Sequence, residues 1–279
     1  MIRVIQIAVL IVLCFLLISC TPKSDNNFPD NIKIKDLAPI NVDGSPKTNK
    51  LKTINFDLQI LEIPVENFSK LGEIRRILNV RPIKFNNYLA FSANSFSAYN
   101  GKFQTLRNVF DLLQIAGAKN ITSMGIFLLD GGTDDVVIKK LAQIQTVSFN
   151  SLKGDEESVR VGPPGVIAMH IKAEKVTSLD DSAAVTICPF FISNTISQFN
   201  LINKQRDFPF TSTALQMNMV PGDFMLLVPE RYISDQSTLS GVFFSNPDGN
   251  MFYTYDESKP PEHKPSFRVY LLTCIGMNI

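Results

Sequence analysis

The feature that most constrains the fold of this chain is a succession of short apolar runs between Lys119 and Met277. Sequences rich in Gly, Pro, Asp and Asn separate these runs, at residues 130–132, 153–155, 162–165, 221–223 and 246–249. Short apolar runs divided in this way are typical of antiparallel strands, because such residues form the tight turns between them. The sequence therefore predicts a mostly β domain over residues 129–279, built as antiparallel sheets or a sandwich.

The preceding region, residues 53–128, predicts a smaller mixed unit, which is either a domain of its own or part of one continuous sheet system with residues 129–279. Its first segment, INFDLQILEIP, alternates apolar and polar side chains with the period of a half-buried strand. Apolar residues at helical spacing predict one helix over Glu66–Leu78 and a second one that ends at a C-cap glycine, Gly117. Tyr88–Tyr99, between these helices, is interpreted as a strand pair or a bent strand. The fold class is thus predicted as α+β, mostly β, with two short helices near the N-terminal side.

The N-terminus has the layout of a secretory signal. Arg3 precedes an apolar run over residues 4–18, which is shorter than the roughly 20 residues that a membrane-spanning helix needs. The sequence Leu17-Ile18-Ser19-Cys20 that follows resembles the lipobox of bacterial lipoproteins. The resemblance implies that residues 1–19 are a signal peptide, and that the mature chain begins at a lipidated Cys20. An uncleaved N-terminal anchor is the alternative.

Residues 20–52 are predicted to be the lipidated cysteine and a flexible tether, because they are rich in Asn, Asp, Lys, Pro and Ser and show no sustained period. A flexible coil of this length spans roughly 30 Å root-mean-square, which holds a domain clear of the lipid surface. In lipoproteins of this kind an aspartate after the cysteine often signals retention in the inner membrane. Thr21 at that position favours the outer membrane, so the predicted location is the cell envelope, lipid-anchored.

Charge and motif content argue against several classes of function. Without Arg3, 26 basic residues balance 26 acidic ones, and a neutral chain gives no support to nucleic-acid binding. The two histidines are interpreted as structural or solvated, since His170 lies in an alternating apolar run and His263 in a polar, proline-rich loop. The motifs of serine hydrolases, zinc proteases and phosphate-binding loops are absent. No catalytic residue, metal or cofactor is therefore predicted.

Clusters of acidic residues raise two further possibilities, a calcium site and a hydrolase that uses carboxylates. Asp130, Asp134 and Asp135 lack the spacing of a calcium loop, and a turn that leaves a strand is the favoured interpretation of this cluster. The acidic run at residues 155–157 is interpreted as a solvated hairpin tip. A pair of carboxylates that hydrolyses glycosides is formed in space and not in sequence, so a carboxylate-dependent hydrolase stays open as an alternative function.

Two further pairs of residues are candidates for specific roles. Cys188 and Cys274 lie in apolar, strand-like runs and could form a disulfide in an oxidising compartment; two buried free thiols are the alternative. Tyr253 and Tyr255 precede a long polar loop, and alternation places both on the outer side of a strand. They are a possible binding surface, with an ordinary sheet face as the alternative.

The C-terminal part, residues 185–279, weakly resembles the β-domain of secretins, which form outer-membrane rings in type II and type III secretion. The similar segments are VTICPFFIS (Val185–Ser193) and TALQMNMVPGDFMLLVPE (Thr213–Glu230), in which strand, glycine turn and apolar strand follow one another. The LGDLP-type signature and a lipid-facing set of strands are absent. The resemblance implies a related fold without the pore.

These observations favour a non-enzymatic, membrane-anchored envelope lipoprotein. We expect it to be a scaffold or a component of an envelope or secretion assembly that acts through contacts with other envelope proteins. The alternative in the same compartment is a surface lipoprotein that binds a carbohydrate or a peptide.

Replacing Cys20 with Ala is expected to abolish metabolic labelling of the protein with palmitate and to leave the precursor unprocessed, because the acylated thiol is lost. Cys14→Ala is the matched control, since that cysteine lies within the segment to be removed and its loss should leave labelling unchanged. Persistent label on the Cys20→Ala variant would contradict the lipobox assignment.

Overall fold

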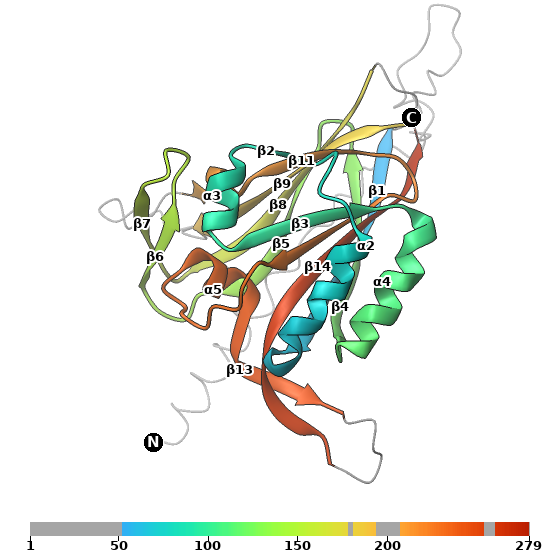
Figure 1. The fold of residues 1–279 in the computed structure, drawn as a ribbon. Coiled ribbons are helices and arrows are strands. Elements are labelled where there is room, and N and C mark those ends of the chain that lie inside the picture. Colours follow the sequence, from blue (N-terminus) through green and yellow to red (C-terminus); the bar gives the residue numbers. More distant parts are fainter. Residues whose placement is uncertain (1–51, 178–180, 194–206, 254–259, 279) are drawn as a thin grey trace, which may run out of the picture. The chain divides into compact units, whose positions relative to one another are not determined.

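The computed structural model describes residues 52–177, 181–193, 207–253 and 260–278, and residues 50–279 form one compact unit (Figure 1). Its strands are β1 (Thr53–Pro64), β2 (Lys84–Phe85), β3 (Phe96–Gly101), β4 (Lys119–Leu129), β5 (Thr133–Lys140), β6 (Gln145–Asn150), β7 (Glu156–Val161), β8 (Gly165–Lys175), β9 (Ala183–Ser193), β10 (Phe208–Pro209), β11 (Leu215–Met219), β12 (Phe224–Pro229), β13 (Ser245–Phe252) and β14 (Glu262–Asn278). Its helices are η2 (Val65–Lys70), α2 (Leu71–Ile77), α3 (Tyr88–Ala93), α4 (Phe103–Ile115), η3 (Thr211–Thr213) and α5 (Leu239–Phe244).

The described strands form three antiparallel sheets. The first sheet has the order β3-β12-β14-β1-β4, with β13 also paired to β14. The second sheet has the order β2-β11-β9-β8-β5, with β10 paired to β9, and β6 and β7 form a separate two-stranded sheet. The prediction of an α+β, mostly β fold with antiparallel sheets is confirmed.

Alternation along β1 explains how the layers pack. Its residues Phe56 and Leu58 are fully buried in one apolar core with Ile167 and Ile171 of β8, so this core lies between the two large sheets. Later in β1, Ile63 belongs to a second core that also contains residues of α2 and α4. Helices α2 and α4 therefore cover the outer face of the first sheet, as Figure 1 shows. Period-two alternation thus places one side of β1 toward each core.

The two predicted helices are present with small differences. The first is a 3₁₀ turn followed by the short helix α2, and the second is α4. Helix α4 ends in a Schellman motif, in which Ala118 N–H donates to the Leu113 carbonyl and Gly117 N–H donates to the Gln114 carbonyl. Gly117 adopts a φ of 74°, a left-handed conformation that glycine reaches without steric cost. The expected role of this glycine is confirmed.

Two segments predicted as strands are helices. The first half of Tyr88–Tyr99 is α3, whose N-cap Asn87 accepts a hydrogen bond from Ala90 N–H at 3.0 Å. The run GVFF (Gly241–Phe244), one of the short apolar runs after Lys119 that were expected to be strands, belongs to α5, where the Thr238 hydroxyl accepts from Gly241 N–H at 3.1 Å. In both cases the polar N-cap side chain accepts a hydrogen bond from a backbone N–H in the first turn of the helix. In a strand, that N–H would bond to a neighbouring strand instead.

The sequence division at residues 128 and 129 is not a domain boundary. From the N-terminal part, β1 pairs with β14 and β3 pairs with β12, both of which lie in the C-terminal part. The segments 53–128 and 129–279 therefore share one sheet and one fold.

A buried carboxylate lies between the large sheets at one end of β1. Glu62 is 1% exposed and accepts hydrogen bonds from Arg268 Nε at 3.0 Å and Ser266 Oγ at 2.9 Å. Burial raises the pKa of Glu62, but hydrogen bonds from Arg268, Ser266, Asn246 and Asn250 outweigh burial and hold the pKa below its ordinary value of 4.5. Arg268 also donates to the carbonyl of Ile138 in β5 at 2.9 Å, so the network joins the first sheet to the second.

Glu62→Gln is expected to destabilise the fold by about 3 kcal/mol at neutral pH, because it leaves the Arg268 charge without its partner. In the wild type, the stabilisation that comes from the ionised Glu62 carboxylate is fully present above its ordinary pKa of 4.5. This stabilisation is lost as the pH falls through the pKa of Glu62 in the folded state, which is lower. The free energy of unfolding of Glu62→Gln should therefore lack this loss in acid. Urea unfolding at several pH values measures both effects. Glu66→Gln is the control, since this exposed partner of Lys264 should cost at most about 1 kcal/mol.

Candidate functional site

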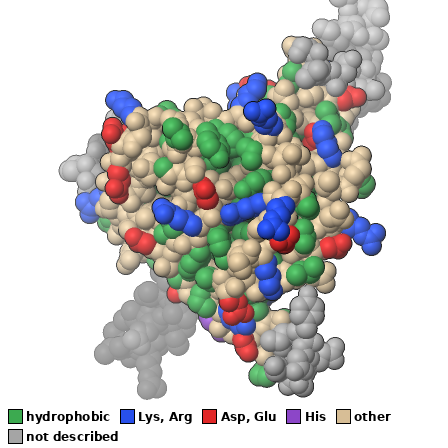
Figure 2. Space-filling view, in the orientation of Figure 1, with side chains coloured by type: hydrophobic (Ala, Val, Ile, Leu, Met, Phe, Trp, Pro, Cys, Tyr) green, Lys and Arg blue, Asp and Glu red, His purple; other side chains and the backbone are tan. Residues whose placement is uncertain are grey.

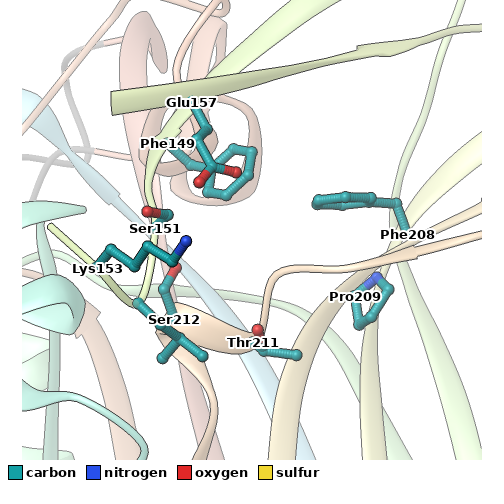
Figure 3. Close-up of a pocket in the computed structure, with 9 residues that line it drawn as sticks. Phe149, Ser151, Lys153, Glu157, Phe208, Pro209, Thr211 and Ser212 are labelled. Carbon is teal, nitrogen blue, oxygen red and sulfur yellow. The ribbon is translucent and has the colours of Figure 1, made fainter. Parts of the chain in front are cut away.

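A pocket of about 210 Å³ lies between the β6–β7 hairpin and the segment that contains β10 and η3 (Figure 3). We call it the hairpin pocket. Its walls combine aromatic, hydroxyl and charged side chains, contributed by Phe149, Ser151, Leu152, Lys153, Glu157, Phe208, Pro209, Thr211 and Ser212. The hairpin stands apart from the large sheets at one side of the domain (Figure 1).

Aromatic packing fixes the apolar wall of the hairpin pocket. Phe149 faces inward from β6 and is 7% exposed. Its ring centroid lies 5.5 Å from that of Phe208 and 5.3 Å from that of Phe210, and the last two rings are 5.2 Å apart. Rings at these separations attract one another in tilted or edge-to-face geometry. The hairpin is thereby tied to the second sheet through β10.

Backbone hydrogen bonds fix the position of β6 from the other side. Ser148 N–H donates to the carbonyl of Ser237 at 2.7 Å, and Asn150 N–H donates to the side-chain oxygen of Asn94 at 2.8 Å. The side chain of Asn87, in turn, donates to the Leu152 carbonyl at 2.8 Å. These contacts hold the hairpin rigidly although it belongs to neither large sheet.

The polar wall of the hairpin pocket contains an unpartnered hydroxyl. Ser151 is 7% exposed, and its Oγ atom has no hydrogen-bond partner in the described part of the chain. In Figure 3 the amine of Lys153 lies near Ser151 and Ser212, while Phe208 and Pro209 form the opposite wall. A buried hydroxyl without a hydrogen-bond partner destabilises a fold. The Ser151 hydroxyl is therefore available to form a hydrogen bond with a ligand in the pocket.

A second pocket, of about 200 Å³, lies on the other side of β6. It is more polar, and its walls include Asn94, Asn150, Glu156, Arg231 and Ser240. Ser240 is 2% exposed and its hydroxyl also has no partner among the described residues. Each of the two pockets is lined by a single carboxylate, Glu157 in the hairpin pocket and Glu156 in the second.

Exposed apolar side chains lie at one side of the hairpin pocket. Leu152, in its wall, is 45% exposed. The first residues of α3, Tyr88 and Leu89, are 57% and 80% exposed, and the Asn87 hydrogen bond to Leu152 places them beside this turn. Apolar side chains of this size at a pocket rim are a common property of surfaces that contact other proteins.

The two cysteines considered for a disulfide are free and buried. Cys188 lies in β9 of the second sheet and Cys274 in β14 of the first. Burial raises the pKa of Cys188 to about 12 and that of Cys274 to about 11. Both groups are therefore thiols at neutral pH and poor nucleophiles, which matches the alternative of two buried thiols.

The predicted aromatic and lipidated residues are only partly described. Tyr253 follows β13, is 81% exposed and lines neither of the two pockets. Tyr255 and Cys20 lie outside the described residues. Lipidation and the tyrosine surface thus stay predictions.

The histidines and the acidic residues Asp130, Asp134 and Asp135 do not form a common site among the described residues. His170 of β8 pairs with Asp135 of β5, with 2.7 Å between Nδ1 and Oδ1. Asp130, in the turn before β5, accepts from Lys175 N–H at 2.7 Å, and Asp134 caps the backbone N–H of Asp135. His263 lies in β14. Among the described residues no His, Cys, Asp or Glu cluster is suited to hold a metal ion.

Comparisons with known proteins yield no relative: no family model matches the chain, and neither a curated protein nor a solved structure matches it significantly. In the described residues, no helix is both long and apolar enough to span a bilayer.

Sequence reasoning missed the hairpin pocket because its walls come from segments distant in sequence. Residues 149–157 were interpreted as a strand, a turn and a solvated tip, and residues 208–212 carry no motif. The one available signal is the aromatic density of Phe208-Pro209-Phe210 beside hydroxyl residues.

Ser151→Ala is expected to leave the free energy of unfolding unchanged or to raise it by up to about 1 kcal/mol, because no hydrogen bond is lost and an unsatisfied group is removed. Ser266→Ala, the matched control, removes a hydrogen bond to the Glu62 carboxylate and should cost about 1.5–3 kcal/mol. Denaturant unfolding of both variants measures the difference. An equal loss in Ser151→Ala would show that its hydroxyl is satisfied within the fold.

Proposed function

We propose that this chain is a non-enzymatic, lipid-anchored lipoprotein of the cell envelope that binds a partner protein through the hairpin pocket and its apolar rim. The anchor is Cys20, and the outer membrane is the favoured location. The observation that carries the proposal is a pocket whose buried Ser151 hydroxyl has no partner among the described residues, with exposed apolar side chains beside it.

The position of the pocket in the domain supports this function. The predicted tether, residues 20–52, joins the domain at Thr53, which pairs with Asn278 near the C-terminal end. In Figure 1 this end of β1 lies at the upper right, whereas the β6–β7 hairpin lies at the far left. Within the domain, the hairpin therefore lies away from the strand end that the predicted tether precedes.

The composition of the surface supports recognition by shape and local contacts. On the face drawn in Figure 2, acidic and basic side chains are interspersed, with hydrophobic side chains between them. A mixed surface gives little long-range steering. Binding energy would then come from a few anchored residues, as at most protein interfaces.

The two alternatives have different support. Binding of a carbohydrate draws support from the aromatic wall of the hairpin pocket, since sugars stack on such rings. A carboxylate-dependent hydrolase has less support, because that chemistry uses two carboxylates about 5–10 Å apart and each described pocket is lined by one.

A photoreactive amino acid in place of Lys153 is expected to give a discrete cross-linked protein adduct in the native cell, because this side chain lies at the pocket. Thr211→Trp in the same chain should remove the adduct by filling the pocket from an exposed position. The same photoreactive residue at the exposed Lys140 of β5 serves as control. Equal adducts from both positions, or an adduct insensitive to Thr211→Trp, would argue against the proposal.

A further inference from the structure

We infer that the hairpin pocket receives one large apolar side chain of an extended peptide, whose backbone adds as a further strand to the edge of β7 that no described strand occupies. This inference rests on the proposed function and names the form that the partner takes. Four properties of the described residues carry it: the open edge of β7, the size of the pocket, its unpartnered hydroxyl and the charge beside it.

The edge of β7 has backbone groups that point away from the hairpin. In the described part of the chain, β7 pairs with β6 alone. Ser148 and Asn150 of β6 direct their N–H groups away from β7, toward Ser237 and Asn94. In an antiparallel pair, residues opposite one another either exchange hydrogen bonds or both point outward.

The register then identifies the outward groups of β7. Ser148 is opposite Ser158, and Asn150 is opposite Glu156. Ser158 and Glu156 therefore present their N–H and carbonyl groups to the side where no described strand lies. Such an edge accepts an extended segment by main-chain hydrogen bonds.

The pocket lies within reach of a strand at this edge. Glu157 of β7 is opposite Phe149, so both side chains face the same side, and both line the hairpin pocket. A strand added to β7 would run about 4.8 Å away. Every second side chain of that strand faces the pocket side, and a long one can reach over Glu157 into the pocket.

The size of the pocket fits a single side chain. An engineered protein cavity of about 150 Å³ accepts benzene, and sites for drug-sized ligands have volumes of about 300–1,000 Å³. The hairpin pocket, at about 210 Å³, lies between these values. Aromatic packing from Phe149 and Phe208 suits an aromatic or large aliphatic residue. The Ser151 hydroxyl and the Lys153 amine are available to polar atoms of the same peptide.

Charge at the hairpin tip indicates the flanking residues of the peptide. Asp155, Glu156 and Glu157 are consecutive and exposed, with Lys153 two residues before them. Acidic side chains therefore outnumber basic ones along this start of β7. A peptide with Lys or Arg next to its apolar anchor complements this charge, and its binding should weaken as the salt concentration rises.

The test uses the full-length chain and a phage-displayed library of random heptapeptides, panned on the wild-type protein with the Thr211→Trp variant as counter-selection. We expect enrichment of peptides with one aromatic or large aliphatic residue flanked by Lys or Arg. Fluorescence anisotropy then gives the dissociation constant of an enriched peptide. Thr133→Trp, at an exposed position of β5, is the control for Thr211→Trp and should bind as the wild type does.

Ser158→Pro tests strand addition. Proline removes one outward N–H and is tolerated at a sheet edge, so affinity should fall at least about tenfold, equivalent to about 1.4 kcal/mol. Ser158→Ala keeps the N–H and should bind as the wild type does. Of two peptides N-methylated at the two alternate sets of backbone positions, the one methylated at the N–H groups that face β7 should also bind at least about tenfold more weakly to the unaltered protein, and the other should not. This measurement does not depend on how well the proline variant folds.

The outcomes separate this inference from the proposed function. If Thr211→Trp abolishes binding while Ser158→Pro and N-methylation leave it unchanged, strand addition is wrong and the pocket remains a recognition site. If no peptide is enriched over the Thr211→Trp variant, the peptide inference fails, whatever the cross-linking from Lys153 shows. Binding of N-acetylglucosamine that Thr211→Trp abolishes, without peptide enrichment, would overturn it in favour of a carbohydrate.

Discussion

The pairing of β1 with β14 is the contact on which the rest of the domain depends. It joins the first described strand to the last in a register that runs from Thr53 opposite Asn278 to Pro64 opposite Ser266. Because β1 also pairs with β4 and contributes to both apolar cores, it holds the helices on one face and the second sheet on the other. A fold organised by contacts this distant in sequence forms its centre only when both ends of the domain are present.

The Glu62 network fixes the geometry at one end of this pairing. Apolar packing between two sheets tolerates small shifts, whereas hydrogen bonds are lost within a fraction of their length. Arg268 bonds Glu62 of the first sheet and the Ile138 carbonyl of the second at once, so it permits one stacking of the sheets. Glu62 stays ionised although buried, since its hydrogen bonds outweigh the cost of desolvation. The apolar cores therefore allow small shifts between the sheets, and the Glu62 network selects one arrangement among them.

The parts of the fold that are encoded locally could be predicted from the sequence, and the parts that depend on distant contacts could not. Alternation identified β1, and Gly117 marked the end of α4, because both signals lie within a few residues. Helices α3 and α5 are too short to show a period, and their N-caps, Asn87 and Thr238, were the only local sign of them. Ser151 and residues 208–212 line the hairpin pocket together although they are distant in sequence, so no local pattern indicates the pocket.

The β6–β7 hairpin combines a fixed edge with an open one. Bonds from β6 to Ser237 and Asn94 hold one side of it, and the rings of Phe208 in β10 and of Phe210, just after β10, hold its inner face. A two-stranded sheet is marginal by itself, and these bonds supply the order that it lacks. Rigid support lowers the entropy that a partner must overcome on binding. The hairpin is thus fixed on the β6 side, and on the β7 side it has an edge to which no described strand pairs and to which one further strand could add. This edge lies beside the pocket in which Ser151 Oγ has no hydrogen-bond partner among the described residues.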